Sequence, residues 1–135
     1  MSHAVDVIRA EEDKLGVPHH IVSVQGQGWT SDISFYAKTP LTQDNVVYEV
    51  HGYPPATSDY TYSKIPVIID EYGSLADAES FYADLETKQI SNLAFSFSPY
   101  SDCAPDLLQV NNSSTQLTPT SWGTTVKDYL TSQAP

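Results

Sequence analysis

Residues 65–73 have the sequence Ile-Pro-Val-Ile-Ile-Asp-Glu-Tyr-Gly, and this stretch decides the fold. Its β-branched apolar run predicts a buried strand, and an almost uninterrupted apolar strand is typical of a parallel sheet covered on both faces. Glu71 closes the strand. Because ligands meet a parallel sheet at the carboxyl ends of its strands, a carboxylate at this position is a candidate functional group.

Short apolar runs and longer amphipathic stretches alternate on either side of this strand. Further strands are predicted at residues 21–25, 46–51 and 93–98, and helices at residues 4–15, 74–89 and 121–132. This order, with nearly continuous apolar strands bounded by helices, predicts an α/β fold with four parallel strands.

The remaining segments are predicted from their turn and cap signals. Ser74, with Asp77 three residues later, is close to a capping box and is the expected N-cap of its helix, as Ser121 is for the last one. Residues 33–42 are ambiguous, with a short helical turn as one interpretation, and residues 56–64 and 99–120 are expected to be loops.

The charge and composition exclude several classes of partner. Seventeen acidic against six basic residues give a formal net charge of −11. A field of that sign repels nucleic acids and anionic membranes but leaves a neutral sugar polymer unaffected. No apolar run approaches the ~20 residues needed to span a bilayer, and the polar N-terminus contains no signal peptide. Cys103 is the only cysteine, so neither a disulfide nor a structural zinc site is expected, and no cofactor is predicted.

Five side chains lie where the predicted strands end. They are Trp29, His51, Tyr53, Glu71 and Phe95. A carboxylate among aromatic side chains can attack an anomeric carbon, while a neighbouring His and Tyr can hydrogen-bond it and hold its orientation. An exposed indole or phenyl ring can stack on a sugar.

Each of these residues also has a simpler explanation. Glu71 can pair with a surface lysine such as Lys64, and His51 can be a hydrogen-bonded core or rim histidine. Tyr53 can serve loop packing, Trp29 can be buried beneath the next element, and Phe95 is most simply a core residue. Glu49 shares the His51 side of its strand, where an unpaired charge would be costly, which favours a polar cavity.

Two motifs together resemble strands six and seven of cellulase-type enzymes in glycoside hydrolase family five. Residues 47–53 end in His-Gly-Tyr, matching a His-x-Tyr, and residues 65–73 match a nucleophile strand that ends in Glu, an aromatic residue and Gly. The resemblance implies that residues 21–25 and 93–98 are strands five and eight. Residues 1–135 would then form a single domain, the C-terminal half of a (β/α)8 TIM barrel, beginning at the helix after strand four.

This resemblance implies roles for the candidate residues. Glu71 would be the catalytic nucleophile of a retaining β-glycosidase, with His51 and Tyr53 as its active-site neighbours. Trp29 and Phe95 would contact the substrate, although the family usually places a Trp where Phe95 stands. The family's acid/base glutamate lies in an Asn-Glu-Pro at the end of strand four, and this sequence contains no Asn-Glu-Pro. Retaining hydrolysis needs two carboxyl groups roughly 5–5.5 Å apart, so negligible activity is expected from this chain alone.

Four strands cannot close a barrel, so the outer strands are expected to need a partner. One hypothesis is a second copy that rebuilds an eight-stranded barrel with twofold symmetry, and another is a complementary N-terminal half-barrel chain. Two functions follow: the nucleophile-bearing half of an endoglucanase-like enzyme acting on β-linked glucans, or a non-catalytic structural half-barrel that self-assembles. The resemblance also implies that the parent enzyme is secreted.

Overall fold

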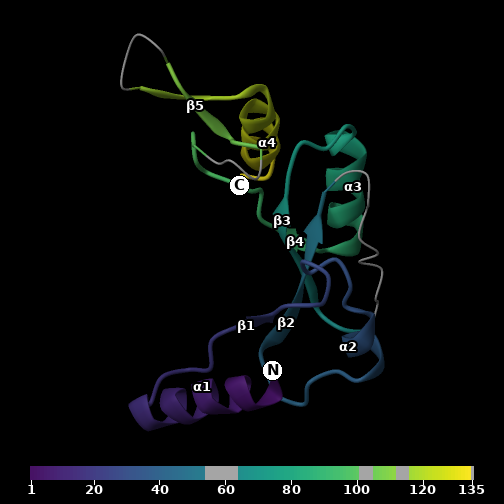
Figure 1. The fold of residues 1–135 in the computed structure, drawn as a ribbon, viewed down its shortest axis with the longest axis vertical. Coiled ribbons are helices and arrows are strands. Elements are labelled where there is room, and N and C mark those ends of the chain that lie inside the picture. Colours follow the sequence, from purple (N-terminus) through teal and green to yellow (C-terminus); the bar gives the residue numbers. More distant parts are fainter. Residues whose placement is uncertain (54–63, 101–104, 112–115, 135) are drawn as a thin grey trace. The chain divides into compact units, whose positions relative to one another are not determined.

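The computed structural model describes residues 1–53, 64–100, 105–111 and 116–134. The elements in chain order are α1 (Ser2–Leu15), β1 (Val22–Val24), α2 (Ser34–Lys38), β2 (Val46–Gly52), β3 (Val67–Tyr72), α3 (Ala78–Lys88), β4 (Ser91–Asn92), β5 (Leu108–Val110), β6 (Leu117–Pro119) and α4 (Ser121–Ser132) (Figure 1). They form two compact units. The first contains residues 1–51 and 58–68, and the second contains residues 52–57 and 69–135. Among the described residues, no helix has the length and apolar character needed to cross a bilayer.

The main sheet has the strand order β1-β2-β3-β4 and is built from parallel strands, as predicted. In the first unit β1 pairs with β2 in the register Val22 to Val46, and the Tyr48 amide donates to the Pro66 carbonyl at 2.9 Å. In the second unit the Leu93 amide donates to the Ile69 carbonyl at 2.8 Å. The inward residues Val24, Val50 and Ile69 are almost completely buried, as expected for strands with an apolar core.

The fourth strand is shorter and lies earlier than the predicted 93–98, because regular pairing is limited to Ser91 and Asn92. Beyond it the chain still follows β3, since the Phe95 amide donates to the Tyr72 carbonyl at 3.0 Å. Phe97 is 82% exposed, so the apolar run that suggested a buried strand is largely uncovered within this chain. Apolar composition alone therefore misplaced the strand.

Helix α1 forms where predicted but buries an unexpected face. Its buried residues are Val5, Arg9 and Glu12, whereas the apolar Leu15 is 71% exposed. The spacing of four and three residues places the buried three on one side of the helix. Two charged residues thus occupy the buried face, and they are paired with each other: Arg9 Nη1 donates to Glu12 Oε2 at 2.6 Å.

Both predicted N-caps are wrong. Helix α3 is capped by Asp77, whose side chain accepts from the Ser80 amide at 3.0 Å, while Ser74 lies outside the helix with φ 46°. Helix α4 is capped by Thr120, whose hydroxyl accepts from the Gly123 amide at 3.0 Å, and Ser121 is the first helical residue. In each case a nearby residue of the same capping class accepts the hydrogen bond from a first-turn amide instead.

The irregular segments contain more structure than predicted. The ambiguous residues 33–42 include the short helix α2, and the loop expected over residues 99–120 contains the antiparallel hairpin of β5 and β6, with Leu108 opposite Pro119. Strands of three residues are too short to show an alternating pattern. The loop expected over residues 56–64 lies, apart from its last residue, outside the described residues, and so does Cys103.

Gly123 is the point of closest approach between α4 and the chain that enters the hairpin. The Leu107 carbonyl accepts from the Thr120 amide at 3.0 Å, and Thr120 Oγ1 donates to the Asp106 carbonyl at 2.7 Å. A Cβ atom on Gly123 would overlap the Leu107 carbonyl oxygen. The absence of a side chain at this position therefore lets the first turn of α4 lie directly on the chain that enters the hairpin.

Gly123→Ala should destabilise the chain by about 1–3 kcal/mol, because the methyl group would push α4 away from the Leu107 carbonyl. Urea unfolding measures the change. Thr124→Ala, at an exposed neighbouring position in the same helix turn, is the matched control and should change stability much less. Equal stability of the two variants would contradict this account of the joint.

Candidate active site

The carboxylate of Glu71 has a specific donor in its own unit. Tyr53 Oη donates a hydrogen bond to Glu71 Oε1 at 3.0 Å. Burial, and then the hydrogen bond to Glu71, raises the pKa of Tyr53 far above its ordinary value. The phenol therefore stays protonated and remains a donor to the carboxylate at every physiological pH.

Glu71 is directed by its neighbour Tyr72, because adjacent residues of a strand point to opposite faces of the sheet. Tyr72 is almost fully buried, donates to Asn92 Oδ1 at 2.8 Å and lies edge-on to Trp122 of α4 with ring centroids 6.1 Å apart. Its hydroxyl also lies 3.3 Å from that of Tyr82 in α3. Since Tyr72 packs against both helices, Glu71 points to the face of β3 that the helices do not cover.

Phe95 follows the end of β3 through its backbone. Its amide is bonded to the Tyr72 carbonyl, and its side chain is partly exposed. The Phe95 carbonyl lies close to Gly73, where a Cβ atom would also collide with Pro105. This close backbone approach holds residue 95 beside the carboxyl end of the strand that carries Glu71.

The other two candidates, Trp29 and His51, lie in the first unit and are linked through Thr30. The His51 amide donates to the Thr30 carbonyl at 3.1 Å, and the Trp29 loop is closed by two backbone hydrogen bonds between Gln27 and Asp32, at 2.9 and 3.2 Å. Trp29 is 93% exposed, so its indole is not buried within its unit. The loop thus presents an open aromatic face at the residue that directly precedes Thr30, the hydrogen-bond partner of the His51 amide.

Glu49 is the buried charge that the sequence singled out. It lies on the same side of β2 as His51, two residues away, and is 6% exposed. Ser23 Oγ donates to Glu49 Oε2 at 2.7 Å, while Glu49 Oε1 is buried with no hydrogen-bond partner among the described residues. Ser23 was not a candidate, although a polar residue between two valines of a predicted buried strand is the signal that would have found it.

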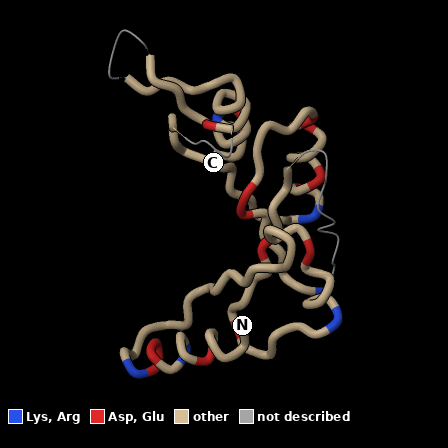
Figure 2. Tube along the Cα trace, in the orientation of Figure 1, with Lys and Arg blue, Asp and Glu red and all other residues tan. Residues whose placement is uncertain are grey.

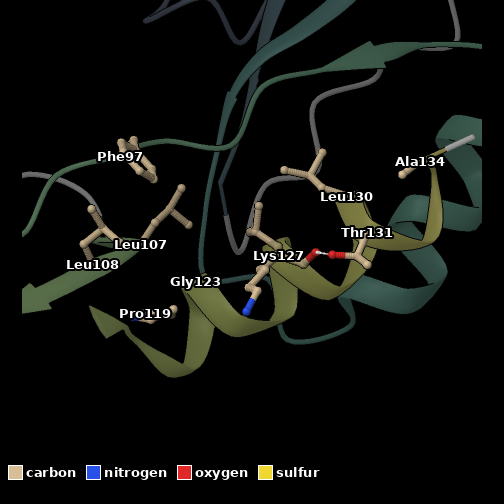
Figure 3. A pocket seen from close by; sticks show the side chains of 10 residues that line it. Phe97, Leu107, Leu108, Pro119, Gly123, Lys127, Leu130, Thr131 and Ala134 are labelled. Atoms are coloured by element: carbon tan, nitrogen blue, oxygen red, sulfur yellow. Dashed lines mark hydrogen bonds between the residues drawn. The ribbon is translucent and has the colours of Figure 1, made fainter. Parts of the chain in front are cut away.

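An apolar hollow of the second unit lies on α4, with a volume of about 480 Å³ (Figure 3). Its lining residues are Phe97, Leu107, Leu108, Pro119, Gly123, Val126, Lys127, Leu130, Thr131 and Ala134. Ligand sites need a few convergent polar groups, but the hydroxyl of Thr131 already donates to the Lys127 carbonyl at 2.8 Å. This α4 groove is therefore poorly suited to a sugar, and the five candidate residues do not line it.

Comparison with known proteins identifies the family. The family model for cellulase, glycosyl hydrolase family 5, matches residues 1–101. The chain belongs to glycosyl hydrolase family 5. No match was found among curated proteins.

Solved structures of glycosyl hydrolase family 5 share the fold. The β-glucanase from Saccharophagus degradans is 20% identical with a TM-score of 0.73, over 98% of this chain and 46% of that one. A thermostable, halotolerant family 5 cellulase from an Icelandic hot spring isolate is 16% identical with a TM-score of 0.71, over 96% and 49%. The endoglucanase catalytic domain from Thermobifida fusca is 18% identical with a TM-score of 0.68, over 96% and 51%.

The chain therefore spans about half the length of the structures it matches, and its four parallel strands and helices correspond to half of a (β/α)8 barrel. This confirms the predicted fold class. In such barrels functional residues lie at the carboxyl ends of the strands, which is where Glu71 and His51 are found in β3 and β2.

Ser23→Ala should destabilise the chain by about 1–3 kcal/mol, because it removes the hydrogen bond to the buried Glu49 carboxylate. Thermal or urea unfolding measures the loss. Adding Glu49→Gln should recover part of it, since a neutral amide is less costly to bury than an unpaired charge. Additive effects of the two substitutions would contradict the coupling.

Proposed function

We propose that the chain is the nucleophile-bearing C-terminal half of a retaining β-glycosidase that hydrolyses β-linked glucans, with Glu71 as the nucleophile. The observation that carries the proposal is the 3.0 Å hydrogen bond from Tyr53 to Glu71 Oε1, at the end of a strand in a family 5 chain. A strand-end glutamate serving only as a surface ion-pair partner would not need a half-buried phenol as its donor.

The hydrogen bond orients the nucleophile. Tyr53 donates to Oε1 and helps to fix the plane of the carboxylate that attacks the anomeric carbon. As the bond between the carboxylate oxygen and that carbon forms, the bond from the carbon to the leaving oxygen breaks, and the leaving oxygen takes a proton from an acid. Water then hydrolyses the glycosyl ester and releases Glu71. The acid belongs to the complementary half of the barrel, since the Asn-Glu-Pro motif is absent here.

The remaining candidates serve the substrate and the nucleophile. His51, two residues before Tyr53, is the second neighbour of the reaction centre, and Trp29 and Phe95 stack on sugar rings. The 93% exposure of Trp29 and the partial exposure of Phe95 support these roles, because each ring has a face that is available for binding.

The substrate class rests on the relatives. Structures of the Saccharophagus degradans β-glucanase and of a Thermobifida fusca endoglucanase variant each contain cellotetraose. A neutral β-linked glucan also suits a chain with a formal net charge of −11, which repels anionic polymers. Nucleic acids and membranes are not proposed as partners.

The partner is a complementary N-terminal half-barrel that closes the fold around residues 1–135 as one half-barrel domain. Relatives with the same fold are about twice as long. The α4 groove supports this, because two of its apolar lining residues, Phe97 and Leu130, are 82% and 58% exposed, and exposed apolar patches mark interaction sites. The parent enzyme is proposed to be secreted.

A second candidate function is a non-catalytic half-barrel that pairs with a second copy of itself. The observation that favours it is the absence of an Asn-Glu-Pro acid from the chain, together with the same uncovered groove. A second copy would bury the apolar surface without supplying the missing carboxyl group. Sedimentation at micromolar concentration separates the two: a stable twofold assembly favours this candidate.

The chain alone should hydrolyse cellulose oligomers negligibly, and mixing it with an N-terminal half-barrel that carries the Asn-Glu-Pro glutamate should restore turnover. Glu71→Gln should then abolish that turnover, while Glu79→Gln, on the exposed surface of α3, should leave it unchanged. Tyr53→Phe should lower kcat about 10–100-fold, the effect of losing one hydrogen bond to a charged group. Strong activity of the chain alone that Glu71→Gln abolishes would contradict the proposed missing acid.

Leu130→Asp should weaken association with the complementary half, because it places a charge at the rim of the α4 groove. Thr124→Asp adds the same charge at an exposed position of α4 outside the groove and is the matched control. Titration followed by sedimentation measures the affinity. If the two variants bind equally well, the groove is not part of the interface.

A further inference from the structure

A cluster of charged groups holds α1 to the turn that precedes β2, all within the first unit. Arg9 and Glu12 are each 7% exposed and form an ion pair at 2.6 Å. Arg9 Nη2 also donates to the carbonyl of Asp44 at 2.9 Å and to that of Asn45 at 3.4 Å. A single buried guanidinium thus joins the helix to two successive carbonyls of the turn.

His19 adds a second link between the same two segments. Its imidazole lies between two carboxylates, with Nε2 3.0 Å from Asp13 at the end of α1 and Nδ1 3.1 Å from Asp44. When both ring nitrogens carry protons, both donate, so the doubly protonated ring satisfies both carboxylates at once. The neutral ring carries one proton and can donate to only one of them.

The turn that these groups hold is the start of the sheet. Asn45 Nδ2 donates to the His19 carbonyl at 2.9 Å, and the Val22 amide donates to the Asn45 carbonyl at 2.9 Å. The next residue, Val46, is the register partner of Val22 in the β1–β2 pair. Fixing this turn therefore fixes the beginning of the β1–β2 ladder.

We propose that Arg9, Glu12, His19 and Asp44 form a pH-dependent clasp, the α1 clasp, which docks α1 onto the start of the β1–β2 ladder in mildly acidic solution and loosens as His19 loses its proton. The α1 clasp is separate from the proposed catalytic residues. Acidic and basic groups are interspersed along α1, as Figure 2 shows.

Shifts in pKa within the cluster set an upper and a lower pH limit for the clasp. The hydrogen bonds to Asp13 and then Asp44 raise the pKa of His19 above its ordinary 6.5, so its contribution is complete below about pH 6.5 and is lost as the pH rises through the raised pKa. The amide of His20, followed by Arg9, lowers the pKa of Glu12 from 4.5 to about 2, and His19 lowers that of Asp44 from 3.8. Those contributions are complete above about pH 4.5 and are lost on acidification.

The charged groups that face the cluster come from both segments. From α1 they are Arg9, Glu12 and Asp13, and from the turn before β2 the carboxylate of Asp44. His20 Nδ1 lies 2.8 Å from Glu12 Oε1 and adds a second, more exposed imidazole. The exposed pair of Lys14 and Glu11 on α1 lies at 3.1 Å and is separate from these contacts.

Hydrogen exchange on the intact chain tests the clasp. Protection factors of the α1 amides, each corrected for the intrinsic rate at its pH, should fall about two- to fivefold between about pH 5.5 and about pH 8.5, the size expected for partly exposed ion pairs. His19→Gln should remove this change. His3→Gln, which replaces an exposed histidine at the other end of the same helix, should keep it and is the matched control.

Asp44→Asn provides a second variant that leaves the buried Arg9–Glu12 pair in place, and it should reduce the pH dependence as well. The α3 amides, which belong to the other unit, should show no matching change. Constant α1 protection across this range, or a loss of pH dependence in His3→Gln equal to that in His19→Gln, would overturn the proposal.

Discussion

The alternation of side chains along β3 is the constraint on which the proposed site depends. Tyr72 is fixed on one face by Asn92, Tyr82 and Trp122, so the preceding residue has to point to the other face. Rotation or slippage of the strand by one residue would bury Glu71 against helices and expose a large aromatic ring. The packing of one tyrosine therefore positions the carboxylate as firmly as the hydrogen bond from Tyr53 orients it.

The parts of the fold that depend on strong local patterns were predictable from sequence. The strand within residues 65–73 and the helix at 121–132 combine apolar periodicity with clear boundaries, and Glu71 followed from its place at a strand end. The N-caps were not predictable from sequence. Ser74 and Asp77 belong to the same class of capping residue, as do Ser121 and Thr120. Only the backbone conformation selects between the members of each pair. The pairing of Tyr53 with Glu71 depends on tertiary geometry across 18 residues, and the sequence indicated it only through the ends of two predicted neighbouring strands and through the family resemblance.

Helix α1 shows why the buried face of a helix is not always its apolar face. Burying Arg9 and Glu12 is costly unless every charge is paired, and here their partners come from the helix itself, from residue 20 and from the turn at residues 44–45. None of these contacts has a sequence signature. The apolar side chains of Ile8 and Leu15 remain exposed on the helix surface, although an amphipathic helix ordinarily buries its apolar side.

The exposed apolar residues and the single catalytic carboxylate have one common explanation in the proposed function. Related structures with this fold are about twice as long, and a retaining mechanism needs two carboxyl groups on opposite sides of one bond. A complementary half-barrel would cover Phe97 and Leu130 and would bring the second carboxyl group with it. A second copy of this chain could cover the same residues but would bring only another Glu71. A partner can therefore bury the groove without restoring hydrolysis. This half-barrel is part of an enzyme only if a single partner both covers the groove and supplies the second carboxyl group.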